Sequence, residues 1–98
     1  MATILRRPQF IDDAYEIWSY VAQENILRAD QIISDLEQCY QVPAESPHIG
    51  VKRLPNYPKF RIFPFGKYII IYSPSDDGSG IELIRLIHSA RDYHHFFR

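Results

Sequence analysis

The fold is decided by one short stretch near the end of the chain, Ile81-Glu82-Leu83-Ile84-Arg85-Leu86-Ile87-His88-Ser89. Side chains alternate between the two faces of a strand. One face would therefore carry Ile81, Leu83, Arg85 and Ile87, and the other Ile84, Leu86 and His88. A sheet with one face exposed to solvent should alternate apolar and polar residues more regularly. We predict a strand over residues 81–89 that is covered on both sides.

Two further strands are predicted just before it. Residues 68–73 form one of them and are apolar or aromatic on both faces as far as Tyr72, and residues 60–65 repeat with the two-residue period of a strand. Gly66-Lys67 joins them with glycine first, as a type II′ hairpin turn requires. Pro64 places its strand near a strand end or a sheet edge. Residues 74–80 form a longer turn, so the three strands make an antiparallel meander.

Two helices are predicted upstream of the meander. Pro8 suits a first helical turn, and apolar residues then recur at helical spacing as far as Val21. Asn25 is a predicted helix stop, and a second helical pattern ends at Pro43. The aromatic residues of this hairpin are expected to pack in the core, namely Tyr15, Trp18 and Tyr40.

Residues 3–6 form a predicted short strand, which completes the element order. The sequence therefore predicts one α+β domain over residues 1–98, with an N-terminal strand and a helical hairpin packed on a mostly antiparallel sheet. The hairpin can cover only one face of that sheet. We expect the C-terminal aromatic residues, a second copy or a different protein to cover part of the other. Asp92 is placed to cap a final helical turn that carries Tyr93, Phe96 and Phe97.

Positive charge is concentrated in the second half of the chain. Residues 1–49 carry three basic and eight acidic side chains, whereas residues 50–98 carry eight basic and four acidic ones. Such asymmetry suggests a polyanionic or acidic partner, although ordinary surface charge gives the same count. The loop from Pro43 to Pro58 carries Lys52 and Arg53 and is long for a compact domain, which indicates a functional role.

Several classes of protein are disfavoured by the sequence. The longest strongly apolar stretch, residues 68–72, is too short to span a bilayer, and the N-terminus lacks the order of a secretory signal. Cys39 is the only cysteine, so no intrachain disulfide forms. We therefore expect a cytoplasmic protein that contacts no membrane. The spacing of histidines and cysteines predicts no metal site, and no glycine-rich phosphate loop precedes a helix. No cofactor is expected.

Three segments together resemble the ParE/RelE superfamily of type II toxins. Residues 13–22, DAYEIWSYVA, are similar to the first helix of ParE-like toxins, and residues 46–50, SPHIG, to the turn after their second helix. Residues 81–92 end in His88-Ser89-Ala90-Arg91-Asp92, which resembles the His-x-Ala-Arg-Asp that often closes the last strand of these toxins. The chain departs from the pattern at Pro64, which interrupts the strand after the loop.

The resemblance implies a toxin that is held inactive by a cognate antitoxin in a hetero-oligomer. Toxins of the ParE branch inhibit DNA gyrase and act in plasmid stabilisation, and the end of the last strand matches this branch better. The first alternative is a RelE-like endoribonuclease that cleaves messenger RNA on the ribosome, and the second is a non-toxic binding or scaffold protein. The leading interpretation is a protein inhibitor without catalytic activity.

Candidate site residues follow from these interpretations. Target-binding residues are predicted to be Arg85, His88, Arg91 and Arg61. A nuclease would use Arg61, Arg85, His88 and Tyr93. The antitoxin is expected on an apolar surface made of Tyr68, Ile70, Tyr72, Ile84, Leu86, Phe96 and Phe97. Arg85 and His88 are three residues apart, so they share one site only if the strand twists or bulges. Arg85 lies on an apolar face and needs a carboxylate or another polar partner.

Overall fold

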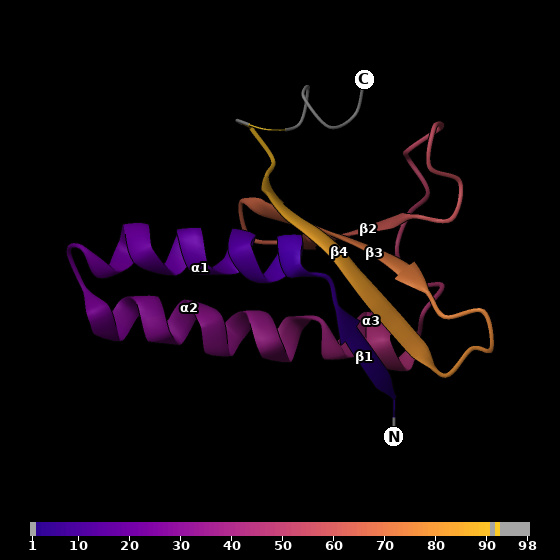
Figure 1. Ribbon diagram of the computed structural model, residues 1–98, viewed down its shortest axis with the longest axis horizontal. Coiled ribbons are helices and arrows are strands. Elements are labelled where there is room, and N and C mark those ends of the chain that lie inside the picture. Colours follow the sequence, from indigo (N-terminus) through magenta and orange to yellow (C-terminus); the bar gives the residue numbers. More distant parts are fainter. Residues whose placement is uncertain (1, 91, 93–98) are drawn as a thin grey trace.

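The chain folds as a helical hairpin packed on a four-stranded sheet (Figure 1). The computed structural model describes residues 2–90 and Asp92. Its elements are β1 (Thr3–Arg6), α1 (Pro8–Ala22), α2 (Ile26–Cys39), α3 (Gln41–Glu45), β2 (Arg61–Phe65), β3 (Tyr68–Pro74) and β4 (Gly80–His88). The strand order is β1-β4-β3-β2, with β1 parallel to β4 and the other pairs antiparallel. The predicted α+β class and the mostly antiparallel sheet are confirmed. Among the described residues, no helix has both the length and the apolar character needed to cross a bilayer.

The helix boundaries differ from the prediction at two residues. Asn25 does not stop α1 but begins α2, because its side chain accepts a 3.0 Å hydrogen bond from the Arg28 N–H and so caps the helix. Pro43 does not end the second helix either. That helix ends at Cys39, and Pro43 lies in the first turn of α3, where a residue without an N–H is tolerated.

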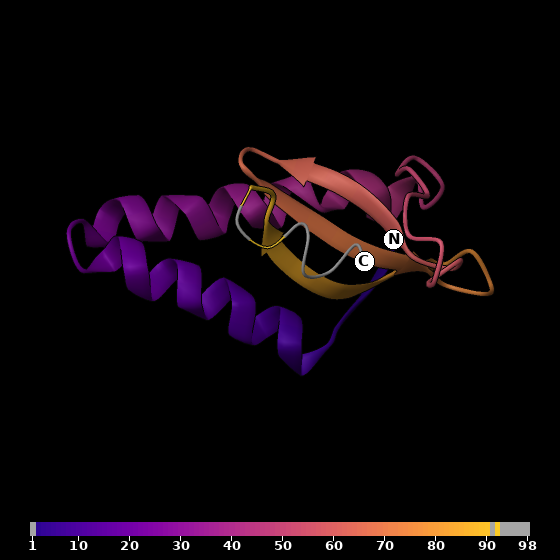
Figure 2. The ribbon, with the colours of Figure 1, turned by 90° about the horizontal axis from the view of Figure 1, so that it is seen from above.

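The hairpin aromatics divide between core and surface. Tyr40 is buried and its ring meets Phe10 edge-on, as a core residue would. Trp18 is half-buried and donates from its indole N–H to Asp30, which ties α1 to α2. Tyr15, also predicted in the core, is instead 66% exposed and stacks on Trp18. The core faces a different side of α1, and the far end of the hairpin extends past the sheet (Figures 1 and 2).

A β-bulge in β4 changes which side chains share a face. Ile71 pairs with Arg85 but Tyr72 pairs with Leu83, so Ile84 is left as the extra residue. Leu83 packs under the helices with Tyr72, whereas Ile84 and Ile87 pack on the opposite face with Ile71. The regular alternation predicted for β4, with Leu83 and Ile87 on one face, is therefore wrong beyond the bulge.

The long loop between α3 and β2 covers the second face of the sheet. Leu54 is 4% exposed and packs with Ile71, Ile84 and Ile87, and Phe60 packs against the same cluster. We expected the C-terminal aromatics, a second copy or another protein at this face, but the chain supplies much of the cover itself. Phe96 and Phe97 lie outside the described residues, as does the predicted final helical turn. The apolar sheet surface that is left for a partner to cover is therefore smaller than the sequence suggested.

The proline in β2 is accommodated at a sheet edge. β2 is the outermost strand, and Pro64 pairs with Ile69 in its ladder. The Pro64 carbonyl accepts a 3.6 Å hydrogen bond from the Cys39 thiol of α2. Gly66 has a φ of 56° and Lys67 has a negative φ, so the turn to β3 is compatible with the predicted type II′ and not with type I′. The departure of this segment from the family pattern leaves the strand pairing intact.

The hydroxyl of Tyr72 anchors the loop from inside. It accepts a 2.9 Å hydrogen bond from the Gly50 N–H and donates a 2.8 Å bond to the Pro47 carbonyl. Burial raises the pKa of Tyr72, against opposing effects of the Gly50 hydrogen bond and the Arg61 charge, so the hydroxyl keeps its proton. A Cβ at position 50 would lie 2.5 Å from that oxygen, which explains the glycine.

We predict that Tyr72→Phe lowers the free energy of unfolding by about 1–3 kcal/mol, because the Gly50 N–H and the Pro47 carbonyl lose their partner. A denaturant titration measures this. Tyr15→Phe is the matched control, since it removes an exposed hydroxyl and should change stability by less than about 0.5 kcal/mol. Equal midpoints for the two variants would mean that the Tyr72 hydroxyl does not anchor the loop.

Candidate functional site

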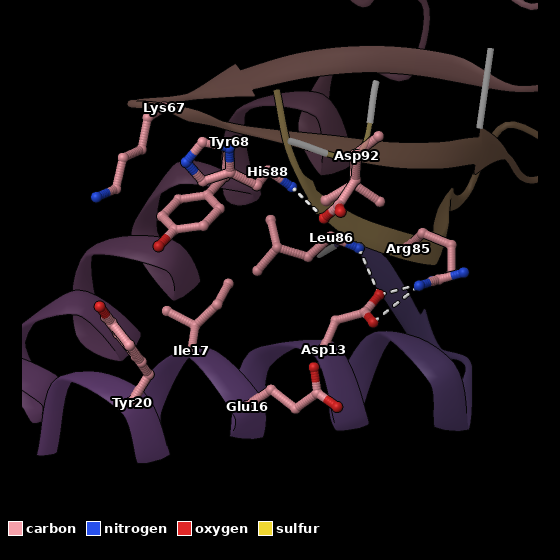
Figure 3. A pocket seen from close by; sticks show the side chains of 11 residues that line it. Asp13, Glu16, Ile17, Tyr20, Lys67, Tyr68, Arg85, Leu86, His88 and Asp92 are labelled. Carbon is pink, nitrogen blue, oxygen red and sulfur yellow. Dashed lines mark hydrogen bonds and ion pairs between the residues drawn. The ribbon is translucent and has the colours of Figure 1, made fainter. Parts of the chain in front are cut away.

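A cleft of ≈ 800 Å³ lies between α1 and the end of β4 (Figure 3). Helix α1 forms one wall, the β2–β3 turn and the start of β3 lie at one end, and β4 forms the opposite wall. Its lining residues are Asp13, Glu16, Ile17, Tyr20, Lys67, Tyr68, Arg85, Leu86, Ile87, His88 and Asp92. The cleft joins an apolar floor to a charged and aromatic rim.

One carboxylate organises the inner end of the cleft. Asp13 accepts hydrogen bonds of 2.7 Å from Arg85 Nε and 3.1 Å from Arg85 Nη2, which is a bidentate ion pair. It also accepts a 2.9 Å bond from the Leu86 N–H, and its side chain is only 14% exposed. The side-chain hydrogen bonding to Asp13 raises the pKa of Arg85 above its ordinary value, so the guanidinium stays charged. The predicted need of Arg85 for a carboxylate partner is met by α1.

His88 stands at the other end of the cleft. Its ring meets the Tyr68 ring edge-on, with 5.5 Å between the ring centroids and 88° between the ring planes. The backbone N–H of His88 donates to an Asp92 carboxylate oxygen at 3.2 Å, and the backbone N–H of Asp92 donates a 2.9 Å bond to the His88 carbonyl. Asp92, four residues beyond the end of β4, therefore bonds back to that end and fixes the backbone of His88.

The electrostatics of the cleft are balanced. Asp13, Glu16 and Asp92 supply negative charge, and Lys67, Arg85 and His88 supply positive or titratable groups. The Arg85 charge is already neutralised by Asp13. Cleavage of RNA through its 2′-hydroxyl needs cations around the phosphate, and this cleft offers few that are uncommitted. Within residues 2–90 and Asp92, no group of three metal-ligating side chains is placed to hold an ion.

Two of the predicted site residues, Arg85 and His88, both line the cleft. The bulge at Ile84 lies before both of them and the pairing from Arg85 to His88 is regular, so Arg85 enters the cleft only through its long side chain, which reaches Asp13 on α1. Arg61 does not join them. Its guanidinium donates to the carbonyls of His48 at 3.1 Å and Gly50 at 2.7 Å, and it lies beside Tyr72, near the end of β3 opposite to Tyr68, which lines the cleft. Arg91 and Tyr93 lie outside the described residues.

The apolar surface predicted for the antitoxin is mostly the protein's own core. Ile70 and Tyr72 are fully buried, and Ile84 and Leu86 are 3% and 4% exposed. Their side chains are held by the helices on one face and the loop on the other, so we withdraw them as contact residues. Tyr68 is half-buried and lines the cleft, where it remains a candidate. Phe96 and Phe97 lie outside the described residues.

Sequence reasoning missed the residues that α1 contributes. Asp13, Glu16 and Tyr20 line the cleft, yet none of them was predicted as a site residue. The signal for Asp13 was present, because an arginine on an apolar strand face requires a carboxylate from a covering element. Tyr20 is 77% exposed, and its role at the rim is visible only once the hairpin is placed on the sheet.

We predict that Arg85→Ala lowers the free energy of unfolding by about 1–3 kcal/mol, and that Asp13→Ala lowers it further because the Leu86 N–H also loses its acceptor. A double-mutant cycle between the two should give a coupling of about 0.5–3 kcal/mol. The pair Arg7–Glu82 is the control, since both side chains are more than a third exposed and its coupling should be about 0–1 kcal/mol. The same coupling in both cycles would contradict an organising role for Asp13.

Comparisons with known proteins agree with this geometry. A search of the curated proteins found no match. A similar solved structure is the RelB-RelE antitoxin-toxin complex from Methanococcus jannaschii, with 20% sequence identity, 94% of this chain and 98% of that chain covered, and a TM-score of 0.55. At that identity the likeness concerns the fold. The family model of the ParE toxin of the type II toxin-antitoxin system parDE matches residues 4–93, and the chain therefore belongs to the ParE toxin family.

Proposed function

We propose that this toxin inhibits DNA gyrase, and that a cognate antitoxin neutralises it. Membership of the ParE toxin family supports a type II toxin, and the ParE-like end of β4 favours the gyrase branch. The observation that carries the choice is the charge balance of the cleft, where Arg85 is neutralised by Asp13 and Arg61 lies elsewhere. A protein inhibitor needs a complementary surface, whereas a nuclease needs free cations and a base at the scissile phosphate.

The rim of the cleft is the proposed contact surface. Lys67 is exposed at the turn between β2 and β3, and His88 stands beside it near the end of β4 (Figure 3). Arg91, three residues beyond His88 in sequence, remains a proposed target-binding residue. Arg85 supports this surface by holding β4 against α1, and acts as a positioning residue. His88, Lys67 and Arg91 would then make the contacts to the target.

We predict that the purified protein blocks gyrase supercoiling and leaves ribosome-bound messenger RNA intact. His88→Gln should weaken inhibition at least about tenfold, as loss of a contact at the centre of an interface does. Arg28→Gln is the control, because Arg28 is exposed on α2 and lies outside this cleft. Circular dichroism confirms that each variant is folded. Codon-specific cleavage of RNA with normal supercoiling would establish the nuclease instead. The absence of both activities would favour a non-toxic binding protein.

An antitoxin that fills the cleft would neutralise the toxin by covering the same rim. The relative named above is itself an antitoxin-toxin complex, which supports an antitoxin partner here. Tyr20 on α1 and Tyr68 at the start of β3 offer aromatic surface to the cleft, and Ile17 and Leu86 add apolar surface. An apolar side chain of the partner can be buried there, while its backbone covers His88. Both proposed partners act in the cytoplasm, which is the proposed location.

We predict that the product of a neighbouring antitoxin gene raises the melting temperature, because a ligand at about 100 times its Kd adds about 2.7 kcal/mol to the folded state. Tyr20→Asp should abolish most of this shift. Tyr15→Asp is matched to it, since both tyrosines lie on α1 and are largely exposed, but Tyr15 does not line the cleft. If both variants lose the rise in melting temperature equally, the antitoxin binds outside the cleft. If the antitoxin does not raise the melting temperature of the unmodified protein, the proposal that it is a partner is refuted.

A further inference from the structure

The loop between α3 and β2 carries a concentration of positive charge that the proposed function does not use. Residues 50–61 hold four basic side chains and no acidic one, whereas residues 62–98 hold four of each. The entire excess of positive charge in the second half of the chain therefore lies in this loop and at the start of β2. Arg61 is turned inward to the loop carbonyls, and Lys52, Arg53 and Lys59 remain exposed.

These three cations have no carboxylate partner in the part of the chain that the structure describes. The ion pairs found there are Arg7–Glu82 and Asp13–Arg85. Unpaired surface lysines and arginines carried on one loop raise the local positive potential and attract polyanions. We define Lys52, Arg53 and Lys59 as the basic loop surface. It lies on the loop side of the sheet, away from the residues that line the cleft.

The loop is held in one shape, although it contains no helix or strand of its own. Val51 and Ile62 exchange backbone hydrogen bonds of 3.1 and 2.9 Å, Tyr72 binds Gly50, and Leu54 is buried under the loop. The backbone then turns twice, with the Tyr57 N–H bonded to the Leu54 carbonyl and the Phe60 N–H to the Tyr57 carbonyl. The exposed cations are thus carried on an ordered backbone, which lowers the entropy lost when a ligand binds.

The aromatic residues of the loop indicate which kind of nucleic acid fits. Tyr57 and Phe60 stack on each other, with 5.2 Å between ring centroids and 4° between planes, and the Arg7 guanidinium lies 5.9 Å from the Phe60 ring. Phe60 is also packed into the second core. Proteins that hold single strands present open aromatic rings to successive bases. In this loop the two rings stack on each other, and the exposed side chains of Lys52, Arg53 and Lys59 carry positive charge, which suits the phosphates of a duplex.

From the charge, the exposure and the rigidity of this loop, we infer that the basic loop surface binds the phosphate backbone of double-stranded DNA without sequence preference. Cations that neutralise phosphates release condensed counterions, and this release drives binding. The surface is separate from the cleft, so the protein can contact duplex DNA and a protein target at the same time. This inference extends the proposed function, since gyrase is itself bound to DNA, but it does not depend on it.

Fluorescence anisotropy with a labelled 20-base-pair duplex of arbitrary sequence tests the inference on the full chain. Three neutralised phosphates predict a slope of about −3 in a plot of log K against log salt. Lys52→Gln/Arg53→Gln should bind about sixtyfold more weakly at 0.1 M salt, with a slope near −1, because each lost contact costs about eightfold there. Arg28→Gln removes an exposed arginine from α2 and should bind as the unmodified protein does.

Three outcomes would overturn the inference. They are the absence of binding at 50 mM salt, an equal loss of affinity in Arg28→Gln, and tighter binding to single-stranded RNA of the same length than to the duplex. A thermal melt of each variant ensures that lost affinity does not reflect unfolding. A parallel supercoiling assay separates the two claims. Gyrase inhibition without DNA binding refutes only this inference. DNA binding without gyrase inhibition supports this inference and refutes the proposed function.

Discussion

The pair of strands β3 and β4 carries apolar side chains on both faces, and most other features of the fold serve to keep water away from them. Ile70, Tyr72 and Leu83 require cover on one side, and Ile71 and Ile87 require it on the other. The first side is covered by the hairpin, whose buried residues include Phe10 and Leu36. The second is covered by an irregular loop that has only Leu54 and Phe60 to bury. Removing either cover would expose a set of isoleucines to water at about 25 cal/mol per Å² of apolar surface.

An irregular loop can serve as one layer of a core only if its backbone polar groups find partners. Here residues of β2 and β3 provide these hydrogen-bond partners. The Tyr72 hydroxyl and the Arg61 guanidinium reach the carbonyls of Pro47, His48 and Gly50, and Ile62 pairs with Val51. Buried backbone groups without partners would cost about 1–3 kcal/mol each. The same side chains that stabilise the loop also fix where its exposed residues point, so packing on the inside determines the surface outside.

The element order and the fold class were accessible from the sequence because they rest on periodicity and on turn chemistry. Residues 3–6 and 61–65 were placed within a residue of their observed bounds, and Gly66 marked the hairpin. The bulge at Ile84 was not accessible, since nothing in an apolar run distinguishes an extra residue from a regular one. The cover of the second face was also missed, because a loop with a single buried leucine has no period. Tyr15 was misplaced because α1 has apolar residues on two sides, and only the position of the sheet shows which side is buried.

Only the β4 side of the candidate site was predicted from the sequence. The last strand supplied Arg85 and His88 because its sequence resembles a family pattern, and both residues line one cleft. The opposite wall came from α1, where Asp13 and Tyr20 have no distinctive local pattern. Arg61 was assigned to the same site because it is basic, but it lies at the end of β2 that is far from the cleft and donates to two loop carbonyls. Charge identifies candidates along a chain, and topology decides which of them meet.

The pairing of β1 with β4 joins Thr3 to Gly80 and Arg6 to Leu83, so the two ends of the described chain meet inside one sheet. Local contacts such as those within the helical hairpin form early, whereas contacts between residues distant in sequence form slowly because a long loop must be closed first. During synthesis the hairpin therefore emerges with its apolar stripe uncovered, because β3 and β4 are made after it. The cleft has one wall from α1 and the other from β4. It forms only when β4 packs against α1, so a chain synthesised only as far as β3 has helices but no cleft.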